Sequence, residues 1–141
     1  MATQTFTVPE NRIAADVVDA CILIHRKLGP GLLESTYQKV LAFELHRRGH
    51  SVELEVPVPL LWEGEVVEEV AYRVDQVVDN LVVLELKSTQ QTSLVHHKQA
   101  QTSTCLLEKR LGMLLNFGLP LMKDGIFRKS NGLPEEPTDS A

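Results

Sequence analysis

One stretch of the chain, Tyr72–Lys87, constrains the fold more than any other. It reads YRVDQVVDNLVVLELK, two β-branched runs joined by Asp79-Asn80, which is the pattern of a β-hairpin. Three charged residues, Asp75, Glu85 and Lys87, interrupt these otherwise apolar strands. Burying such charges costs free energy unless a partner compensates. A divalent cation would compensate, because carboxylate oxygens are the ligands that Mg²⁺ prefers.

The length of the hairpin loop decides whether the three charges meet. Glu85 and Lys87 are two residues apart and therefore share one face of their strand. A two-residue loop at Asp79-Asn80 puts the carboxylates of Asp75 and Glu85 on opposite faces, because a slip of one residue turns every side chain over. A three-residue loop that includes Leu81, or a bulge, pairs Asp75 with Glu85, and we predict one of these. The other face is then nearly all apolar, as a core face should be, and consists of Val74, Gln76, Val78, Val82, Leu84 and Leu86.

Length and composition indicate a single globular domain. The chain has 141 residues, of which 43% are hydrophobic and 23% charged, enough to bury one core. No apolar run is long enough to cross a bilayer, so no membrane association is expected. Cys21 and Cys105 lie in apolar, helix-like segments, which favours buried free thiols and a cytoplasmic location. A net charge of −5 argues against a protein that coats nucleic acid through bulk electrostatics, but not against an enzyme that cuts it.

The hydrophobic pattern predicts the order α, α, β, β, β, α, β and a last short strand, which makes a mixed sheet flanked by helices. We expect residues 1–8 to be flexible, 9–129 to form the single domain, and 130–141 to be a disordered tail. Pro57 and Pro59 indicate an edge strand. The predicted helices are Pro9–Leu28, Leu32–Arg48 and Leu94–Leu111. The predicted strands are Ser51–Leu61, Val66–Val78, Leu81–Lys87, Met113–Phe117 and a short one across Lys123-Asp124-Gly125.

The three hairpin charges support two interpretations. In the first, Asp75 and Glu85 hold one or two Mg²⁺ or Mn²⁺ ions, with the main-chain carbonyl of Leu86 as a further ligand. Lys87 would then orient or deprotonate a water molecule, or neutralise charge in the transition state of phosphodiester hydrolysis. In the second, Asp75 and Lys87 form a cross-strand ion pair and Glu85 is an exposed strand residue.

The motifs of the chain resemble those of the GxxExxY family, a small-protein branch of the PD-(D/E)XK nuclease superfamily. The name motif lies within HRKLGPGLLESTY, as Gly31, Glu34 and Tyr37. The likeness covers residues 10–130 and keeps its order throughout. It continues through ELHRRG (44–49), VPVPLLWEG (56–64), YRVD (72–75), LELK (84–87), His96-x-x-Gln99 and LLNFGLPLMKDGIFR (114–128).

This resemblance implies a restriction-endonuclease-like α/β core in which Asp75, Glu85 and Lys87 match the acidic and lysine positions of the superfamily. It also implies that Glu34 is the additional acidic residue ahead of the sheet, and that Gln99 approaches the metal or the substrate phosphate. Two positions depart from the pattern. Ser103 stands where comparable members often carry a tyrosine four residues after the glutamine, and Val74 replaces the proline that gives the superfamily its name.

Three further residues are candidates for substrate binding. Arg73 shares the predicted face of the charged residues and could bind phosphate, or could pair with Asp75 or Glu85. Tyr37 lies one turn after Glu34, where it could line the site, although a core position with a bonded hydroxyl is favoured. A third candidate, His96, could face the cleft, whereas His25 is expected to pack at a helix end.

The leading hypothesis is therefore a Mg²⁺-dependent nuclease that acts on DNA in preference to RNA. The alternative is a catalytically silent nuclease-like module that binds nucleic acid or a protein partner. The negative net charge and the scattered basic pairs favour this alternative. A homodimer would be compatible with either, since two copies can place two sites on one duplex. A purely structural role for the charged hairpin is the weakest of the interpretations.

Overall fold

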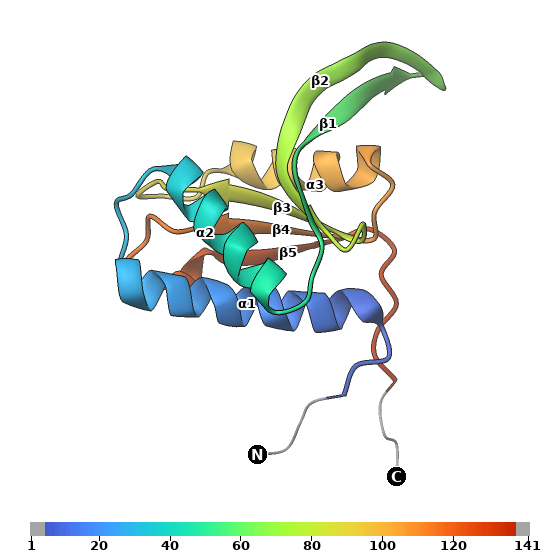
Figure 1. Cartoon of the computed structure of the whole chain (residues 1–141). Coiled ribbons are helices and arrows are strands. Elements are labelled where there is room, and N and C mark those ends of the chain that lie inside the picture. The colour runs from blue at the N-terminus through green and yellow to red at the C-terminus, as the bar shows by residue number, and fades with distance from the viewer. Residues whose placement is uncertain (1–4, 138–141) are drawn as a thin grey trace.

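The computed structural model describes residues 5–137, which form three layers (Figure 1). A five-stranded sheet of order β1-β2-β3-β4-β5 is covered by α1 and α2 on one face and by α3 on the other. The pair β3–β4 is parallel and the remaining pairs are antiparallel, so the predicted mixed α/β architecture is confirmed. The elements are α1 (Pro9–Leu28), α2 (Glu34–Arg47), β1 (Val52–Trp62), β2 (Glu65–Val78), β3 (Val82–Lys87), α3 (Leu94–Leu106), β4 (Leu111–Asn116), the 3₁₀ turn η1 (Met122–Gly125) and β5 (Ile126–Ser130).

The main core lies between the sheet and the first two helices. Helix α1 has the predicted bounds: Pro9 stands in its first turn and Gly29, with φ 71°, ends it. Its apolar stripe and that of α2 pack on β3 and β4, whose side chains are buried on both faces. Tyr37 of α2 stacks on Phe117 with 4.4 Å between ring centroids. Each large apolar side chain buried here contributes roughly 1.5–3 kcal/mol, which fixes α2 against the sheet.

The long β1–β2 hairpin begins in the sheet and ends outside it. β1 is an edge strand, as Pro57 and Pro59 predicted. Beyond Val58 the register of the pair shifts twice, and the ribbon curls away from the body of the molecule (Figure 1). Every residue from Leu60 to Val70 is exposed, so this segment, which we call the arm, is not covered by any other part of residues 5–137.

The predicted end of the third helix was wrong. Helix α3 stops at Leu106, and Glu108 adopts φ 55° where a glycine would be usual. The amides of Glu108 and Lys109 donate to the carbonyls of Cys105 and Thr104, which is the pattern of a Schellman motif. Gly112, expected to end the helix, lies inside β4. A residue without a side chain fits there because a Cβ atom would meet the Thr104 Oγ1 at 1.9 Å.

Smaller differences concern the cysteines and the C-terminal part. Cys21 is a buried free thiol whose pKa burial raises, but Cys105 is exposed on α3, contrary to prediction. The last strand begins at Ile126, after the 3₁₀ turn that holds Lys123-Asp124-Gly125. After Ser130 the described chain is irregular, and Glu136 accepts hydrogen bonds from Thr7, Val8 and Asn11. Residues 1–4 and 138–141, within the predicted flexible termini, lie outside the described range.

None of the helices in residues 5–137 has the length and hydropathy that crossing a bilayer requires.

The close approach of α3 to β4 gives a stability prediction. Gly112→Ala should lower the free energy of unfolding by about 1–3 kcal/mol, because the added methyl group overlaps Thr104 Oγ1. Thr104→Ala in the same chain removes that oxygen, so the double variant should be more stable than the sum of the single variants predicts. Urea unfolding of the four proteins measures both effects. A Gly112→Ala variant as stable as the wild type would contradict the packing described.

Candidate active site

The hairpin loop that brings the charged residues together has three residues. Val78 pairs with Val82, and Asp79, Asn80 and Leu81 lie between them. Asp79 and Asn80 have φ values of 51° and 57°, and the Leu81 amide donates to the Val78 carbonyl at 2.9 Å. Asp and Asn tolerate this left-handed conformation better than other residues with a side chain. The predicted odd-length loop is therefore confirmed.

Side chains from three segments hold this loop in place. The Asp79 carboxylate accepts the amide of Ser51 at 2.8 Å and lies 2.6 Å from Nδ1 of His50. The other ring nitrogen of His50 lies 2.7 Å from the Asp16 carboxylate on α1. Burial alone would lower the pKa of His50, but the two carboxylates raise it overall. The loop is thus tied to the start of β1 and to α1, which fixes the register of β2 on β3.

The ladder between β2 and β3 ends one step before Asp75. Its last pair is Gln76 with Leu84, and the Asp75 carboxylate accepts the Leu86 amide at 2.7 Å. The alternation of β2 breaks here, because Val74 packs with Val77 on the α3 side and not with the core face predicted for it. The N–H and C=O of one strand residue point the same way. The Leu86 carbonyl therefore also faces β2 and Asp75.

Glu85 is a buried carboxylate without a hydrogen-bond partner for one of its oxygens. Its side chain lies in β3, the residue is 5% exposed, and Oε1 is unpaired. Burial raises the pKa of Glu85 to about 8, with a further contribution from the Asp75 carboxylate. The pKa of Asp75 is also raised, mainly by burial, although the Leu86 amide opposes the shift. Such an arrangement is costly without a cation, and it excludes the exposed strand position considered for Glu85.

Three more charged groups act on this acidic pair. Lys87, half-buried at the end of β3, lowers the pKa of both Asp75 and Glu85. Its ammonium forms no ion pair with either carboxylate within 4.0 Å, so the cross-strand ion pair of the second interpretation is absent from residues 5–137. Glu34, the first residue of α2, raises the pKa of both carboxyl groups, as does Glu55 of β1. The structure thus brings Glu34, predicted from the resemblance, to the same site.

Glu55, which lies within the predicted strand Ser51–Leu61, was not among the predicted site residues. Its φ of 51° breaks the alternation of the strand opposite Asp75. The Gln38 amide nitrogen on α2 donates to Glu55 Oε1 and to the Asp75 carbonyl, both at 3.0 Å. Gln38 therefore ties the irregular parts of both strands to the helix. No local pattern signals this contact, because it joins residues 17 and 37 positions apart.

A hollow of about 390 Å³ opens beside the charged residues. Leu32, Leu33, Glu34 and Ser35 line one side and Ser88, the residue after Lys87, lines the other. The Ser88 hydroxyl donates to the Leu32 carbonyl at 2.6 Å, which holds the two sides together. Glu34 and the residue that follows Lys87 therefore line the same hollow.

The predicted site residue on α3, Gln99, is half-buried one turn before Ser103. The Ser103 hydroxyl donates to the Gln99 carbonyl, and Tyr72 Oη lies 2.7 Å from Ser103 Oγ. Burial, with a smaller contribution from Glu85, raises the pKa of Tyr72. The phenol of Tyr72 on β2 thus lies beside Ser103, the position on α3 where comparable family members often carry a tyrosine. Tyr72 was noted only as part of the hairpin, since sequence spacing could not reveal its contact with α3.

The other predicted site residues make contacts with groups other than the carboxylates of the acidic pair. Arg73 is exposed and donates to the Glu55 carbonyl at 3.2 Å, forming no ion pair with Asp75 or Glu85. Tyr37 is fully buried and its hydroxyl donates to the Gly29 carbonyl, which confirms the favoured core position with a bonded hydroxyl. His96 forms a capping box with Ser93 at the start of α3. His25 packs at the end of α1, with Nε2 2.8 Å from the Leu119 carbonyl.

Comparison with known proteins identifies the class of this fold and site. Residues 11–129 match the family model of the PD-(D/E)XK nuclease superfamily, and the chain therefore belongs to that superfamily. Its mixed sheet with flanking helices is the restriction-endonuclease-like α/β fold of this class. No curated protein and no solved structure gives a significant match to the sequence.

The donor set fits the divalent metal that such nucleases usually use. The carboxylates of Asp75 and Glu85 and the Leu86 carbonyl offer hard oxygen ligands, and the unpaired Glu85 Oε1 lacks a partner that a cation would supply. In residues 5–137 no group of three or more His, Cys, Asp or Glu side chains is close enough to form a metal site alone. Mg²⁺ suits a site with few protein ligands, because it keeps several water molecules.

The raised pKa of Glu85 gives a prediction for the metal-free protein. Below about pH 4.5 the wild type and Glu85→Gln should be similarly stable, because the carboxyl group is neutral in both the folded and the unfolded wild type. As the pH rises to about 8, the Glu85 carboxyl group ionises more readily in the unfolded chain than in the folded protein. The free energy of unfolding of the wild type should therefore fall by about 3–5 kcal/mol relative to that of the variant.

Denaturant unfolding in EDTA, repeated across this pH range, measures the difference. Glu69→Gln, on the exposed arm, is the matched control and should show no such pH-dependent difference. If the difference in the free energy of unfolding between the wild type and Glu85→Gln were the same at every pH, it would contradict the buried position of this carboxyl group.

Proposed function

We propose that the protein is a Mg²⁺-dependent phosphodiester hydrolase that acts on DNA, and that Mn²⁺ can replace Mg²⁺. The observation that carries this proposal is the buried Glu85 carboxylate beside Asp75, with an unpaired oxygen, in a chain of the nuclease superfamily. The GxxExxY motif at Gly31, Glu34 and Tyr37 supports assignment to that branch. The free thiols of Cys21 and Cys105 support a cytoplasmic location.

In this proposal the residues of the site have distinct roles. Asp75, Glu85 and the Leu86 carbonyl would hold the cation, which would supply Lewis-acid chemistry to the scissile phosphate and to the attacking water. Lys87 orients the attacking water or neutralises charge that develops on the phosphate. Glu34, at the mouth of the hollow, accepts a hydrogen bond from that water. Gln99 approaches the substrate phosphate from α3.

Cleavage assays on single-stranded, duplex and branched DNA and on RNA, with Mg²⁺ or Mn²⁺, test the proposal. Lys87→Ala and Asp75→Asn should each lower the rate by about 100-fold or more, which is the scale of general acid–base and metal-site contributions. Lys123→Ala removes an equal charge from an exposed position in the 3₁₀ turn η1 and should leave the rate unchanged. Absence of cleavage with every substrate and both metals would contradict the enzymatic role.

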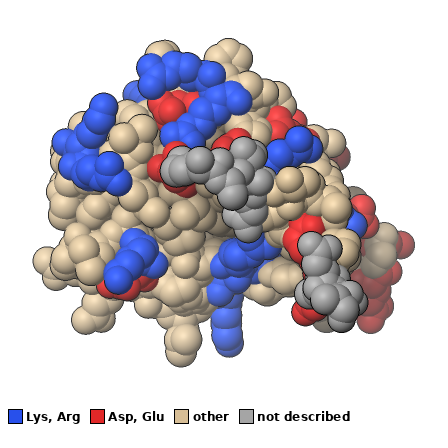
Figure 2. Space-filling view, turned by 90° about the horizontal axis from the view of Figure 1, so that it is seen from below, with Lys and Arg blue, Asp and Glu red and all other residues tan. Residues whose placement is uncertain are grey.

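One observation favours a second function, a silent module that binds nucleic acid or a protein partner. Lys and Arg side chains form separate patches on the face seen in Figure 2, and the net charge is −5. A nuclease that holds duplex DNA tightly usually presents more positive charge. Binding of nucleic acid without metal and without cleavage would support this second function, whereas metal-dependent turnover would support the first.

A further inference from the structure

The arm at the end of the β1–β2 hairpin is a two-stranded ribbon with no packing partner in the described part of the chain. Its large apolar side chains are exposed to solvent: Trp62 is 70% exposed and Val67 is 63% exposed. A two-stranded ribbon alone is marginally stable in water, and its free edges can pair with other chains. Surface apolar groups concentrated in this way mark an interaction site. The other exposed large apolar side chains of the arm are Leu60, Leu61, Val66 and Val70.

The charge of the arm restricts what can bind it. Glu63, Glu65, Glu68 and Glu69 lie within residues 60–70, and this segment contains no lysine or arginine. Four carboxylates on so short a ribbon repel the phosphates of nucleic acids and of acidic lipids. The fitting partner is therefore an apolar hollow on a protein, with positive charge at its rim.

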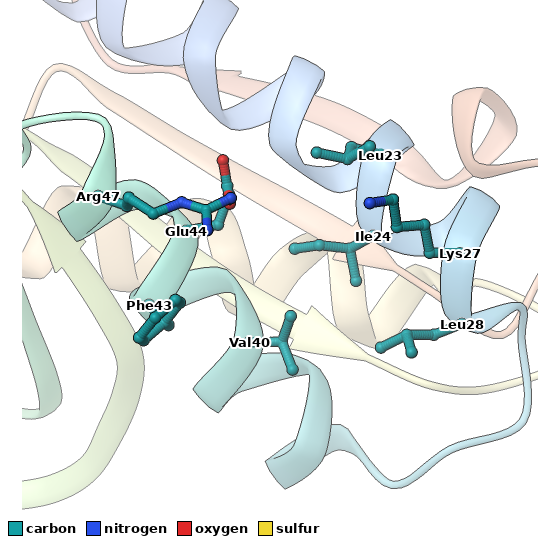
Figure 3. Close-up of a pocket in the computed structure, with 8 residues that line it drawn as sticks. All are labelled: Leu23, Ile24, Lys27, Leu28, Val40, Phe43, Glu44 and Arg47. Atoms are coloured by element: carbon teal, nitrogen blue, oxygen red, sulfur yellow. The ribbon is translucent and has the colours of Figure 1, made fainter.

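The same chain carries such a hollow on its opposite side, between α1 and α2 (Figure 3). It has a volume of about 280 Å³ and an apolar floor that includes Ile24, Leu28 and Val40. Phe43 at its edge is 68% exposed. Lys27 and Arg47 flank it, and Arg47 and Arg48 together bind the one carboxylate of the lining, Glu44, so the rim keeps a positive charge that includes Lys27.

We propose that two copies of the chain associate by exchanging arms, with Trp62 of each copy seated in the α1/α2 hollow of the other. The arm points away from α2 in the fold, so it cannot fill the hollow of its own chain (Figure 1). The arm and the hollow are complementary in polarity and in charge. A two-fold axis that puts one arm in one hollow puts the second arm in the second hollow, which closes the assembly as a dimer. This assembly does not depend on catalysis.

Trp62 is the only tryptophan in the chain, so its fluorescence reports docking directly. In a dilution series of the wild type, we expect a mass of two chains and blue-shifted emission at high concentration. Dilution should give a mass of one chain and the emission of a solvent-exposed indole. Phe43→Ser keeps the fluorophore and should weaken association by about tenfold or more, as loss of an aromatic side chain that packs in an interface does. Leu94→Ser, a matched loss of an exposed apolar side chain on α3, should leave association unchanged.

A charge exchange tests the pairing of arm and hollow. Glu63→Lys with Glu65→Lys makes the turn beside Trp62 basic, although Glu68 and Glu69 keep their charges, and Lys27→Glu with Arg47→Glu makes the rim acidic. Each double variant alone places like charges together and should be a monomer. An equimolar mixture should form a heterodimer, because each arm then meets a rim of opposite charge. A wild type that is monomeric with exposed Trp62 at every concentration would overturn the proposal, as would a dimer that Phe43→Ser does not weaken.

Discussion

The site depends on the register of β2 against β3, and that register depends on a three-residue loop. Asp79 and Asn80 accept left-handed backbone conformations, and the Asp79 side chain ties the loop to His50 and Ser51. Shortening the loop by one residue would turn Glu85 to the opposite face of β3. A local backbone constraint thus decides whether two carboxylates meet.

The consequence is a site that works against the stability of the fold. Glu85 is buried with an unpaired oxygen beside Asp75, and the pKa values of both carboxyl groups are raised. A protein selected only for stability would place an apolar side chain there. Burial, however, strengthens the attraction of the same carboxylates for a cation, because the surroundings screen charge poorly. The conflict between folding and charge is the physical signature of a functional site.

Much of this arrangement could be predicted from the sequence. The bounds of α1, the edge position of β1 and the odd-length loop follow from periodicity, proline chemistry and a face-matching argument. The end of α3 was misplaced, because Glu108 occupies a left-handed position where glycine is the usual signal. Glu55 and Tyr72 were not assigned to the site. Their contacts join elements far apart in the chain, and the break in alternation opposite Asp75 leaves no mark in the local pattern.

The central claim is that Asp75 and Glu85 form a metal site, and calorimetric titration of metal-free protein with Mg²⁺ tests it most directly. At neutral pH we predict saturable binding that releases protons to the buffer, because Glu85 is largely protonated before the cation binds. Asp75→Asn and Glu85→Gln should each abolish or greatly weaken this binding. An absence of binding to the wild type, or binding of equal strength to the Asp75→Asn variant, would contradict the account.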